Sequence, residues 1–362
     1  MKSNTVFKKI AAGVMSAAML FTGSALTGES GTPFFAEQTA ISASAWDSHD
    51  PHNLGSTVYA SQGHNKYLYP GDYLTNGSYR AILQGDGNFV IYNTQGNPRW
   101  STNTALNDKY NNPYSGYNLA VQEDGNLVIR ATPKSNGGER WIWATGTNGT
   151  KGYYTLKLES NGTLSFYKNS NASGTKVWTS TDNKVRWHID LRKQNNQSYS
   201  SDKMYPKTYY SETIGAVGCA LASTTMIYNF YKGTSVNPTA LNNSIYLDNN
   251  SWLRWGNVNS RSGWDNFSYT LLAQKLKEGP VIVFVDRNPY SPHNNGHFIV
   301  VHQCTKASGT LSANDFKVLD PAYTYNGDSN MTLNQAMGQI GGYTVTQIQS
   351  WGQSAGRSMP NV

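Results

Sequence analysis

The feature that most constrains this chain is a phrase that occurs three times in its first half. It reads "LQGDGNFVIY" from Leu83, "VQEDGNLVIR" from Val121 and, in a degraded form, "LESNGTLSFY" from Leu158. The starts lie 38 and 37 residues apart (121−83 and 158−121). Self-similarity at a nearly fixed period indicates copies of one supersecondary unit that share a core. The chain is 362 residues long, which leaves room for a second domain beyond the repeats.

Each copy reads as β structure. The pairs Asp86-Gly87, Asp124-Gly125 and Asn161-Gly162 are hairpin signals, and alternating apolar residues follow each of them. A tryptophan closes each unit: Trp100, Trp143 and Trp178.

Side chains alternate between the two faces of a strand. One face of the first copy therefore combines amides, a carboxylate, a methyl-bearing side chain and a phenol, on Gln84, Asp86, Asn88, Val90 and Tyr92. Such a cluster suits a sugar, because each hydroxyl both donates and accepts and the ring has an apolar face. The alternative is that these polar faces only decorate a β scaffold.

The phrase "QGDGNFVIY" resembles the mannose-binding signature of bulb-type lectins at every second residue. The resemblance implies a β-prism of three four-stranded sheets around a pseudo-threefold axis, with the three tryptophans in its core, over residues 46–182. It also implies that Asp86 and Asn88 hold the sugar 2-hydroxyl, that Gln84 and Tyr92 hold neighbouring hydroxyls, and that Val90 packs on the ring.

The other two copies depart from this signature. The second keeps four of its residues, Gln122, Asp124, Asn126 and Val128, and has Arg130 in place of the tyrosine, so weaker or altered binding is expected there. The third keeps only Tyr167, and no binding is expected. Single shallow sites bind weakly, so avidity would supply the rest.

From about Lys184 the repeat gives way to mixed helix and strand patterns, and residues 183–362 are expected to form a second domain of the α+β class. "CALASTTMIYNFYK" predicts a helix that ends at Gly233, and "TLLAQKLKEGP" predicts a second helix. "VIVFV", "HFIVVHQ" and "FKVLD" read as strands. The predicted fold class is therefore a multidomain one, an all-β prism followed by an α+β domain.

Cys219 stands where the first of these helices begins, and the helix N-terminus stabilises a thiolate. A nucleophile also needs a base and a group that orients the base. His297 opens one predicted strand and Asp320 ends another, so the two can meet if those strands are adjacent. Taken singly, each of the three residues also has an ordinary structural explanation. His188, His293 and His302 are weaker candidates, and His188 has no evident orienting partner.

The segments "IGAVGCALASTTMIYNFY", "EGPVIVFV", "GHFIVVHQ" and "KVLDP" resemble, in sequence and order, papain-like peptidases related to the bacteriocin-processing, double-glycine-leader peptidases. The resemblance implies that Cys219 is the nucleophile, His297 the base and Asp320 its orienting group. It further implies that Gln194, or Gln197 in its place, helps to hold the oxyanion. Ala220 and Leu221 depart from the small-residue string usual after the cysteine. No transporter segment accompanies this domain, so leader processing itself is not implied.

The first 45 residues resemble a secretory signal. Lys2, Lys8 and Lys9 precede the apolar run Ile10–Phe21, which is too short to span a bilayer, and cleavage is expected after Ala25 or Ala45. The alternative is an uncleaved membrane anchor. No later segment is apolar enough to span a membrane.

Cleavage after Ala45 leaves a net charge of (29−3)−(22−2) = +6. The cations are scattered, which favours mild attraction to anionic surfaces and gives no sign of nucleic-acid binding. The two cysteines, Cys219 and Cys304, exclude a disulfide scaffold but allow one bridge. No metal site and no cofactor motif is evident.

Three hypotheses follow from the sequence. The first is a secreted cysteine peptidase that a lectin module targets to mannose-type glycans, with a peptide, glycoprotein or cell-wall substrate. The second is a carbohydrate-binding protein, such as a lectin-like bacteriocin or adhesion protein, whose peptidase-like half is degenerate. The third is a thiol acyltransferase or transpeptidase on the same three residues.

Overall fold

The computed structural model of the protein describes residues 51–106, 113–134, 138–169, 171–206, 212–255, 265–286, 296–323, 331–339, 344–350 and 359–362. The expected signal segment and His293 lie outside these ranges. The secretory signal and the weak candidacy of His293 as a base therefore stay predictions. Within the described ranges, no helix combines the length and the apolar character that crossing a membrane requires.

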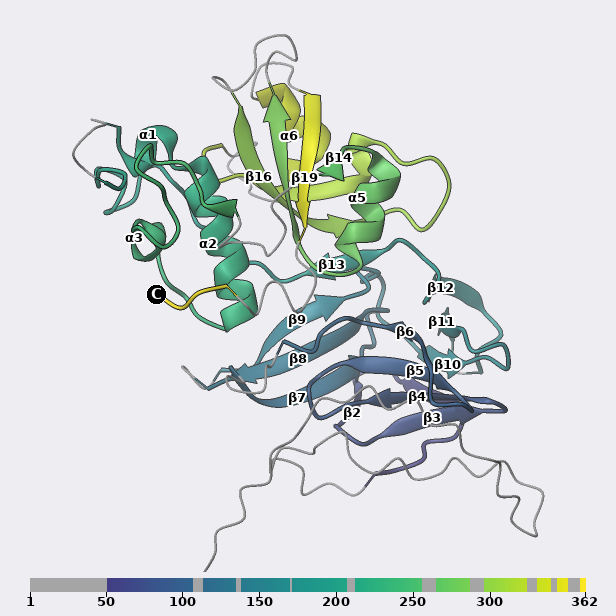
Figure 1. Cartoon of the computed structure of the whole chain (residues 1–362). Helices are drawn as coiled ribbons and strands as arrows, with labels where there is room; N and C mark the ends of the chain where they lie inside the picture. The colour runs from purple at the N-terminus through teal and green to yellow at the C-terminus, as the bar shows by residue number, and fades with distance from the viewer. Residues whose placement is uncertain are drawn as a thin grey trace, which may run out of the picture. The chain divides into compact units, whose positions relative to one another are not determined.

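The repeats fold into three antiparallel sets of four strands (Figure 1). The first set, in spatial order, is β3 (Tyr73–Asn76), β4 (Tyr79–Leu83), β5 (Phe89–Asn93) and β6 (Pro98–Ser101). The second is β1 (Thr57–Ala60), β10 (Tyr154–Leu158), β11 (Leu164–Lys168) and β12 (Thr175–Thr179). The third is β2 (Lys66–Leu68), β7 (Tyr114–Val121), β8 (Leu127–Pro133) and β9 (Arg140–Ala144).

The three tryptophans that close the repeats meet one another in the core. The ring centroid of Trp100 lies 6.4 Å from that of Trp143 and 5.7 Å from that of Trp178, and the last two are 6.3 Å apart. All three pairs are edge-to-face, the arrangement that ring quadrupoles favour. The predicted tryptophan core is therefore confirmed.

The hairpin turns also interlock around this core. Gly87 has φ +83°, where a side chain is strained, and a Cβ atom there would lie 2.3 Å from the ring of Tyr117. The matching glycines of the other two copies meet the rings of Tyr154 and Tyr79 in the same way. Each turn thus packs beneath a tyrosine from a different strand set, which ties the three units together.

The expectation of three separate four-stranded sheets is right for two of them and wrong for the third. Strand β13 (Val185–Trp187) pairs with β9 on one side and with β16 (His297–Cys304) on the other (Figure 1). The third set therefore continues into the second half as one sheet of 11 described strands. The cause is that β9 is left with an open edge, and β13 satisfies its backbone groups. The boundary expected near residue 182 stays a prediction.

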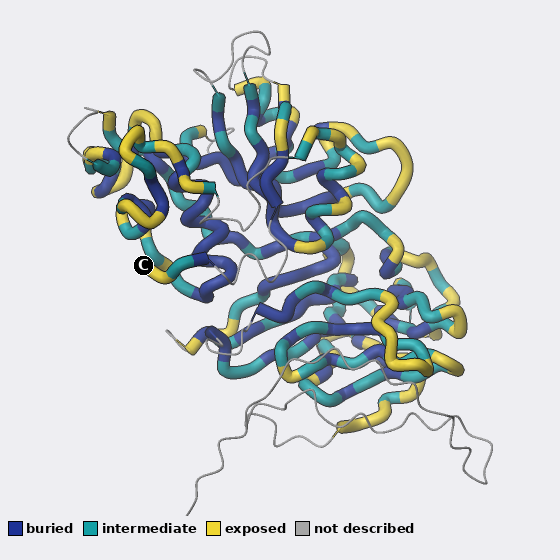
Figure 2. The backbone as a smooth tube through the Cα atoms, in the orientation of Figure 1, coloured by how far each residue is buried: buried dark blue, intermediate teal, exposed yellow. Residues whose placement is uncertain are grey.

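The rest of that sheet comes from the second half. Beyond β16 lie β15 (Val281–Asp286), β19 (Thr344–Ser350) and β14 (Asp265–Asn266), while β17 (Phe316–Leu319) pairs with β16 and with β18 (Met331–Thr332). The helical elements are α1 (Ile214–Val217), α2 (Cys219–Lys232), α3 (Pro238–Leu241), α5 (Tyr269–Leu276), α6 (Leu333–Gln339) and the 3-10 turn η1 (Ala313–Asp315). Helix α2 packs against β16, and both are buried along most of their length (Figure 2). The predicted helix that ends at Gly233 and the three predicted strands are confirmed.

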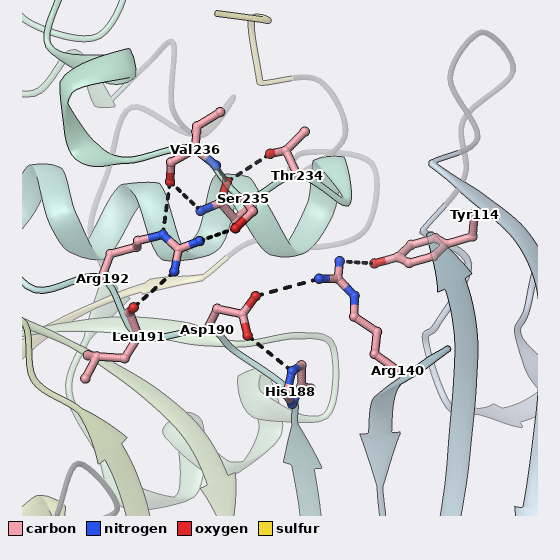
Figure 3. Close-up of polar contacts among 10 residues, drawn as sticks. Tyr114, Arg140, His188, Asp190, Leu191, Arg192, Thr234, Ser235 and Val236 are labelled. Carbon is pink, nitrogen blue, oxygen red and sulfur yellow. Dashed lines mark hydrogen bonds and ion pairs between the residues drawn. The ribbon is translucent and has the colours of Figure 1, made fainter. Parts of the chain in front are cut away.

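Polar side chains connect β9 to the segment that follows β13 (Figure 3). Arg140 donates from Nη2 to the Tyr114 hydroxyl at 3.0 Å and lies 3.7 Å from the carboxylate of Asp190. His188 Nε2 is 3.2 Å from the other oxygen of Asp190. This hydrogen bond, followed by the charges of His188 and Arg140, lowers the pKa of Asp190 against the opposing effect of its burial. His188 thus has a carboxylate partner that was not evident in the sequence.

Candidate functional site

The first predicted sugar site lies on the β4–β5 hairpin, and its polar side chains hold one another in place. Gln84 Nε2 donates to the Tyr92 hydroxyl at 2.9 Å, and Asp86 Oδ1 accepts from the Asn88 backbone N–H at 3.0 Å. Asn88 Oδ1 accepts from Thr102 Oγ1 at 3.1 Å and from the Thr104 N–H at 3.3 Å. These bonds fix the orientation of the Asn88 amide and leave its Nδ2 donors for a ligand.

The second site repeats this arrangement on the β7–β8 hairpin. Asp124 Oδ1 accepts from the Asn126 N–H at 3.1 Å. Asn126 Oδ1 accepts from Thr145 Oγ1 at 2.9 Å and from the N–H groups of Gly146 at 3.0 Å and Thr147 at 3.3 Å. The amide is therefore preset as in the first site, with its donors again turned away from these contacts.

A hollow of about 540 Å³ lies over the second site. Its lining contains the four predicted residues together with Arg130, Glu139, Arg140, Trp141, Ala144, Asn148 and Arg186. Arg130, which replaces the tyrosine of the signature, is 3.0 Å from Glu139 and 5.8 Å from the centre of the Tyr67 ring. Val128 packs in a small outer cluster with Trp141 and Ala144.

Sequence reasoning missed Trp141 as a lining residue for a physical reason. Strict alternation would put Trp141 on the same face as Trp143, which lies in the core. A register shift opposite Ile129 and Arg130 leaves Ile142 without its own partner on β8. Such a bulge reverses the facing of the residues before it, so Trp141 packs with Val128 on the outer cluster. In the sequence, the only sign that Trp141 faces outward is that a second tryptophan, Trp143, follows two residues later.

In the third copy the same positions are occupied by internal contacts. The Tyr167 hydroxyl donates to Glu159 Oε1 at 2.6 Å, and Lys157 Nζ lies 2.8 Å from the other Glu159 oxygen. Thr163 stands where the other copies have an asparagine. The expected lack of binding at this copy remains a prediction, and these contacts are consistent with it.

The predicted thiol site lies in the second half of the chain, at the edge of the sheet where β16 begins and β17 ends. These strands are antiparallel neighbours, with Val300 opposite Leu319, so the start of β16 and the end of β17 lie at one edge. His297 Nε2 is 2.8 Å from Asp320 Oδ1. The same oxygen accepts from the N–H groups of Ala322 at 2.7 Å and Tyr323 at 3.0 Å, which fixes the fully buried carboxylate.

Cys219, at the first residue of α2, completes this group. It is partly exposed, and, against the effect of burial, the interaction with His297 lowers the pKa of its thiol. Because Nε2 of His297 faces Asp320, Nδ1 is the nitrogen left for the thiol. The structure therefore brings the three predicted residues together, with His297 between Cys219 and Asp320.

The charges of this group favour a thiolate paired with an imidazolium. Burial alone would lower the pKa of His297, but hydrogen bonds to Asp320 and Cys219 raise it to about 10. Burial alone would raise the pKa of the Cys219 thiol, yet the hydrogen bond to His297 and those to the backbone of Phe298 and Ala220 lower it below its ordinary value.

Gln194 lies beside this group without joining it. Its backbone N–H donates to the Pro321 carbonyl at 2.9 Å, and its side-chain Nε2 donates to the Gly215 carbonyl at 3.1 Å. It thus links the turn after Asp320 to the helix before Cys219. Within the described ranges its Oε1 has no hydrogen-bond partner, and no bond joins its side chain to the thiol. Gln197 is exposed, and its side chain donates to the Asn196 carbonyl at 2.8 Å.

The remaining cysteine and histidine are placed differently. Cys304 is 1% exposed, unbridged, and burial raises the pKa of its thiol. His302 is buried beside the Trp187 carbonyl, and burial lowers its pKa to about 4. The described residues contain no group of three histidine, cysteine or acidic side chains that could hold a metal.

Gly296, directly before His297, provides a stability test. A Cβ atom there would lie 1.8 Å from Cζ of Phe284 on the neighbouring strand. Gly296→Ala is expected to lower the free energy of unfolding by about 1–3 kcal/mol, the usual cost of overpacking, measured by urea denaturation. Gly152→Ala is the matched control, because a Cβ atom at Gly152 meets nothing within 4 Å. Equal stability of the two variants would contradict the Phe284 contact.

Comparisons with known proteins match the repeat-bearing half. A mannose-specific lectin of Aloe arborescens is 36% identical over 104 residues, which are 28% of this chain and 82% of the relative. The B-type lectin plumieribetin of Scorpaena plumieri is 35% identical over 123 residues, 33% of this chain and 93% of the relative. A solved monomeric mannose-binding lectin of Gastrodia elata has 32% identity, covers 34% of this chain and 96% of its own, and gives a TM-score of 0.27. No family model matches the chain.

Proposed function

The chain belongs to the bulb-type lectin family through about a third of its length, and on that premise we propose that it binds mannose-type glycans through its first two repeats. The observation that carries this proposal is the asparagine amide that internal hydrogen bonds hold in place in each of these two repeats. Asn88 and Asn126 both have their Oδ1 atoms engaged by threonine donors. Their Nδ2 groups, with the carboxylates of Asp86 and Asp124, provide the donor and the acceptor that a sugar hydroxyl requires.

Loss of the two amides tests the sugar sites. The pair Asn88→Asp and Asn126→Asp keeps each Oδ1 acceptor and removes each Nδ2 donor. Binding of the doubly changed protein to immobilised mannose should fall by about tenfold or more, because a lost hydrogen bond leaves ligand groups unpaired. Asn161→Asp, at the matching turn of the third repeat, should bind as wild type does. Undiminished binding by the double variant would refute the proposal.

We further propose that the second half is a thiol hydrolase of peptide or peptide-like amide bonds. The thiolate of Cys219 would attack the carbonyl carbon of the substrate, and the imidazolium of His297 would give its proton to the leaving amine. Water would then hydrolyse the acyl thioester, with His297 taking up one of its protons. The 2.8 Å contact between His297 and Asp320 supports this proposal, because it holds the ring in one orientation.

Electrostatic stabilisation of the oxyanion would come from the start of α2. The first N–H groups of a helix have no partners within the helix, and Cys219 is the first residue of α2. Gln194 would support that site by holding the Gly215 carbonyl rather than by touching the oxyanion. Because export is predicted from the basic and apolar start, we place both activities outside the cell, with a glycoprotein or cell-wall peptide as substrate.

A further inference from the structure

The hollow over the second sugar site extends past the residues of the repeat. Arg186 belongs to β13, which lies outside all three repeats, and yet it lines the same hollow as Asn126 and Val128. It reaches that position because β13 pairs with β9, with Arg186 opposite Ala144. The second site is therefore built from two parts of the chain, and the first site has no counterpart to β13 beside β6 in the described sheet.

Trp141 supplies an apolar wall in this extension. Its side chain packs with Val128 and Ala144, so it continues the apolar spot that a sugar ring would touch. The Arg186 guanidinium carbon lies 5.0 Å from the centre of the Trp141 ring. The ring centroids of Trp141 and His188 are 4.6 Å apart, in an edge-to-face arrangement. An aromatic wall flanked by a cation is suited to a ring with one apolar face and one acidic substituent.

The charges of the hollow are unevenly paired. Arg130 is matched by Glu139 at 3.0 Å and Arg140 by Asp190 at 3.7 Å. Arg186 has no carboxylate partner among the described residues, and its buried Nε has no hydrogen-bond partner there either. A guanidinium presents a fork of donors that matches a carboxylate. Arg186 is thus the cation of this hollow that is available to a ligand anion.

We propose that the second site binds a glycan of at least two residues, a mannose-type residue on Asp124 and Asn126 followed by an acidic sugar. The ring of the acidic sugar lies on Trp141, and its carboxylate pairs with Arg186. This inference rests on the proposed lectin function and adds the ligand class to it. The first site, which lacks both groups, takes the neutral residue alone.

The inference is tested by calorimetric titration of the full chain carrying Asn88→Asp. This change removes the amide donor of the first site, so that the titration measures binding at the second site. The probes are methyl α-mannoside, a neutral mannobiose and a glucuronic acid–mannose disaccharide. At low salt the acidic disaccharide should bind about tenfold more tightly than the neutral one, the gain typical of one charge-assisted contact. Arg186→Gln should abolish this preference, so that the variant binds the two disaccharides with equal affinity. Lys184→Gln, which removes a cation two residues before Arg186 that does not line the hollow, should leave the preference intact.

Equal affinities for the two disaccharides in the parent protein would overturn the inference without recourse to any variant, and so would a preference that Lys184→Gln removes as fully as Arg186→Gln. In either case binding of methyl α-mannoside would leave the proposed lectin function standing. If none of the three probes binds the Asn88→Asp protein, the inference fails, and if methyl α-mannoside also fails to bind the wild-type chain, the lectin function fails with it.

Discussion

Replacing Cys219 with alanine is expected to abolish the proposed hydrolysis, with a loss of about a millionfold in turnover, the cost of removing the covalent nucleophile from an enzyme. The change removes the only atom that can form the acyl thioester, while the helix that carries it stays intact because alanine is a good helix former. The loss would be measured as cleavage of members of a peptide library by the wild-type and variant chains at neutral pH.

Cys304→Ala is the matched control for this variant. Cys304 is buried and is not one of the three residues of the proposed site. Its removal should therefore leave the cleavage rate unchanged, once any loss of stability is allowed for. Reactivity gives a check that needs no substrate. At neutral pH iodoacetamide should label Cys219 at least about tenfold faster than Cys304, because only the first thiol has a lowered pKa. Equal labelling rates would remove the case for a nucleophile.

The same variant separates an enzyme from a binding protein. If Cys219→Ala retains the full biological effect of the chain while the double asparagine variant loses it, the second half is a scaffold for the lectin. If both variants lose it, glycan binding and thiol chemistry act together. A thiol acyltransferase would instead form a new amide when an amine is added to the reaction, and its product would show that directly.

The repeat-bearing half could be predicted in detail from the sequence because its signals are local. The turn pairs, the alternation after them and the tryptophan spacing all lie within one repeat, and the structure places Trp100, Trp143 and Trp178 in mutual contact. The joining of the third sheet to the second half could not be predicted in this way. Strand β13 is three residues long, too short for any periodicity, and its position depends on the open edge of β9.

The site residues also divide into those that local sequence signals could identify and those that depend on how the strands pair. Cys219, His297 and Asp320 could be proposed because each marks the end of a predicted element, and the adjacency of β16 and β17 that this required is found. Their catalytic role stays a prediction. Trp141 and Arg186 could not be proposed, because a bulge reverses the facing of one and a sheet extension positions the other. Asp190 could have been found as a candidate partner, since it is a carboxylate only two residues after His188.

Asp320→Asn is the second change for which a large effect is expected. Asparagine keeps the Oδ1 acceptor for the Ala322 and Tyr323 N–H groups, so the turn is retained while the negative charge beside His297 is lost. Turnover should fall by about a hundred- to ten-thousandfold, the range that a positioned acid–base group contributes. Asp315→Asn, in the 3-10 turn before β17, is the matched control and should keep wild-type turnover.

The pH profile distinguishes this electrostatic effect from mere disruption. The thiolate–imidazolium pair forms above the lowered pKa of Cys219 and is lost as the pH rises through the pKa of His297, at about 10. Activity of the wild-type chain should therefore fall on the alkaline side near that value. Without the carboxylate, the imidazolium is less favoured, so the alkaline limb of Asp320→Asn should move to lower pH by about one to three units. A variant that is slower at every pH but keeps its alkaline limb in place would show that Asp320 positions the ring without sustaining its charge.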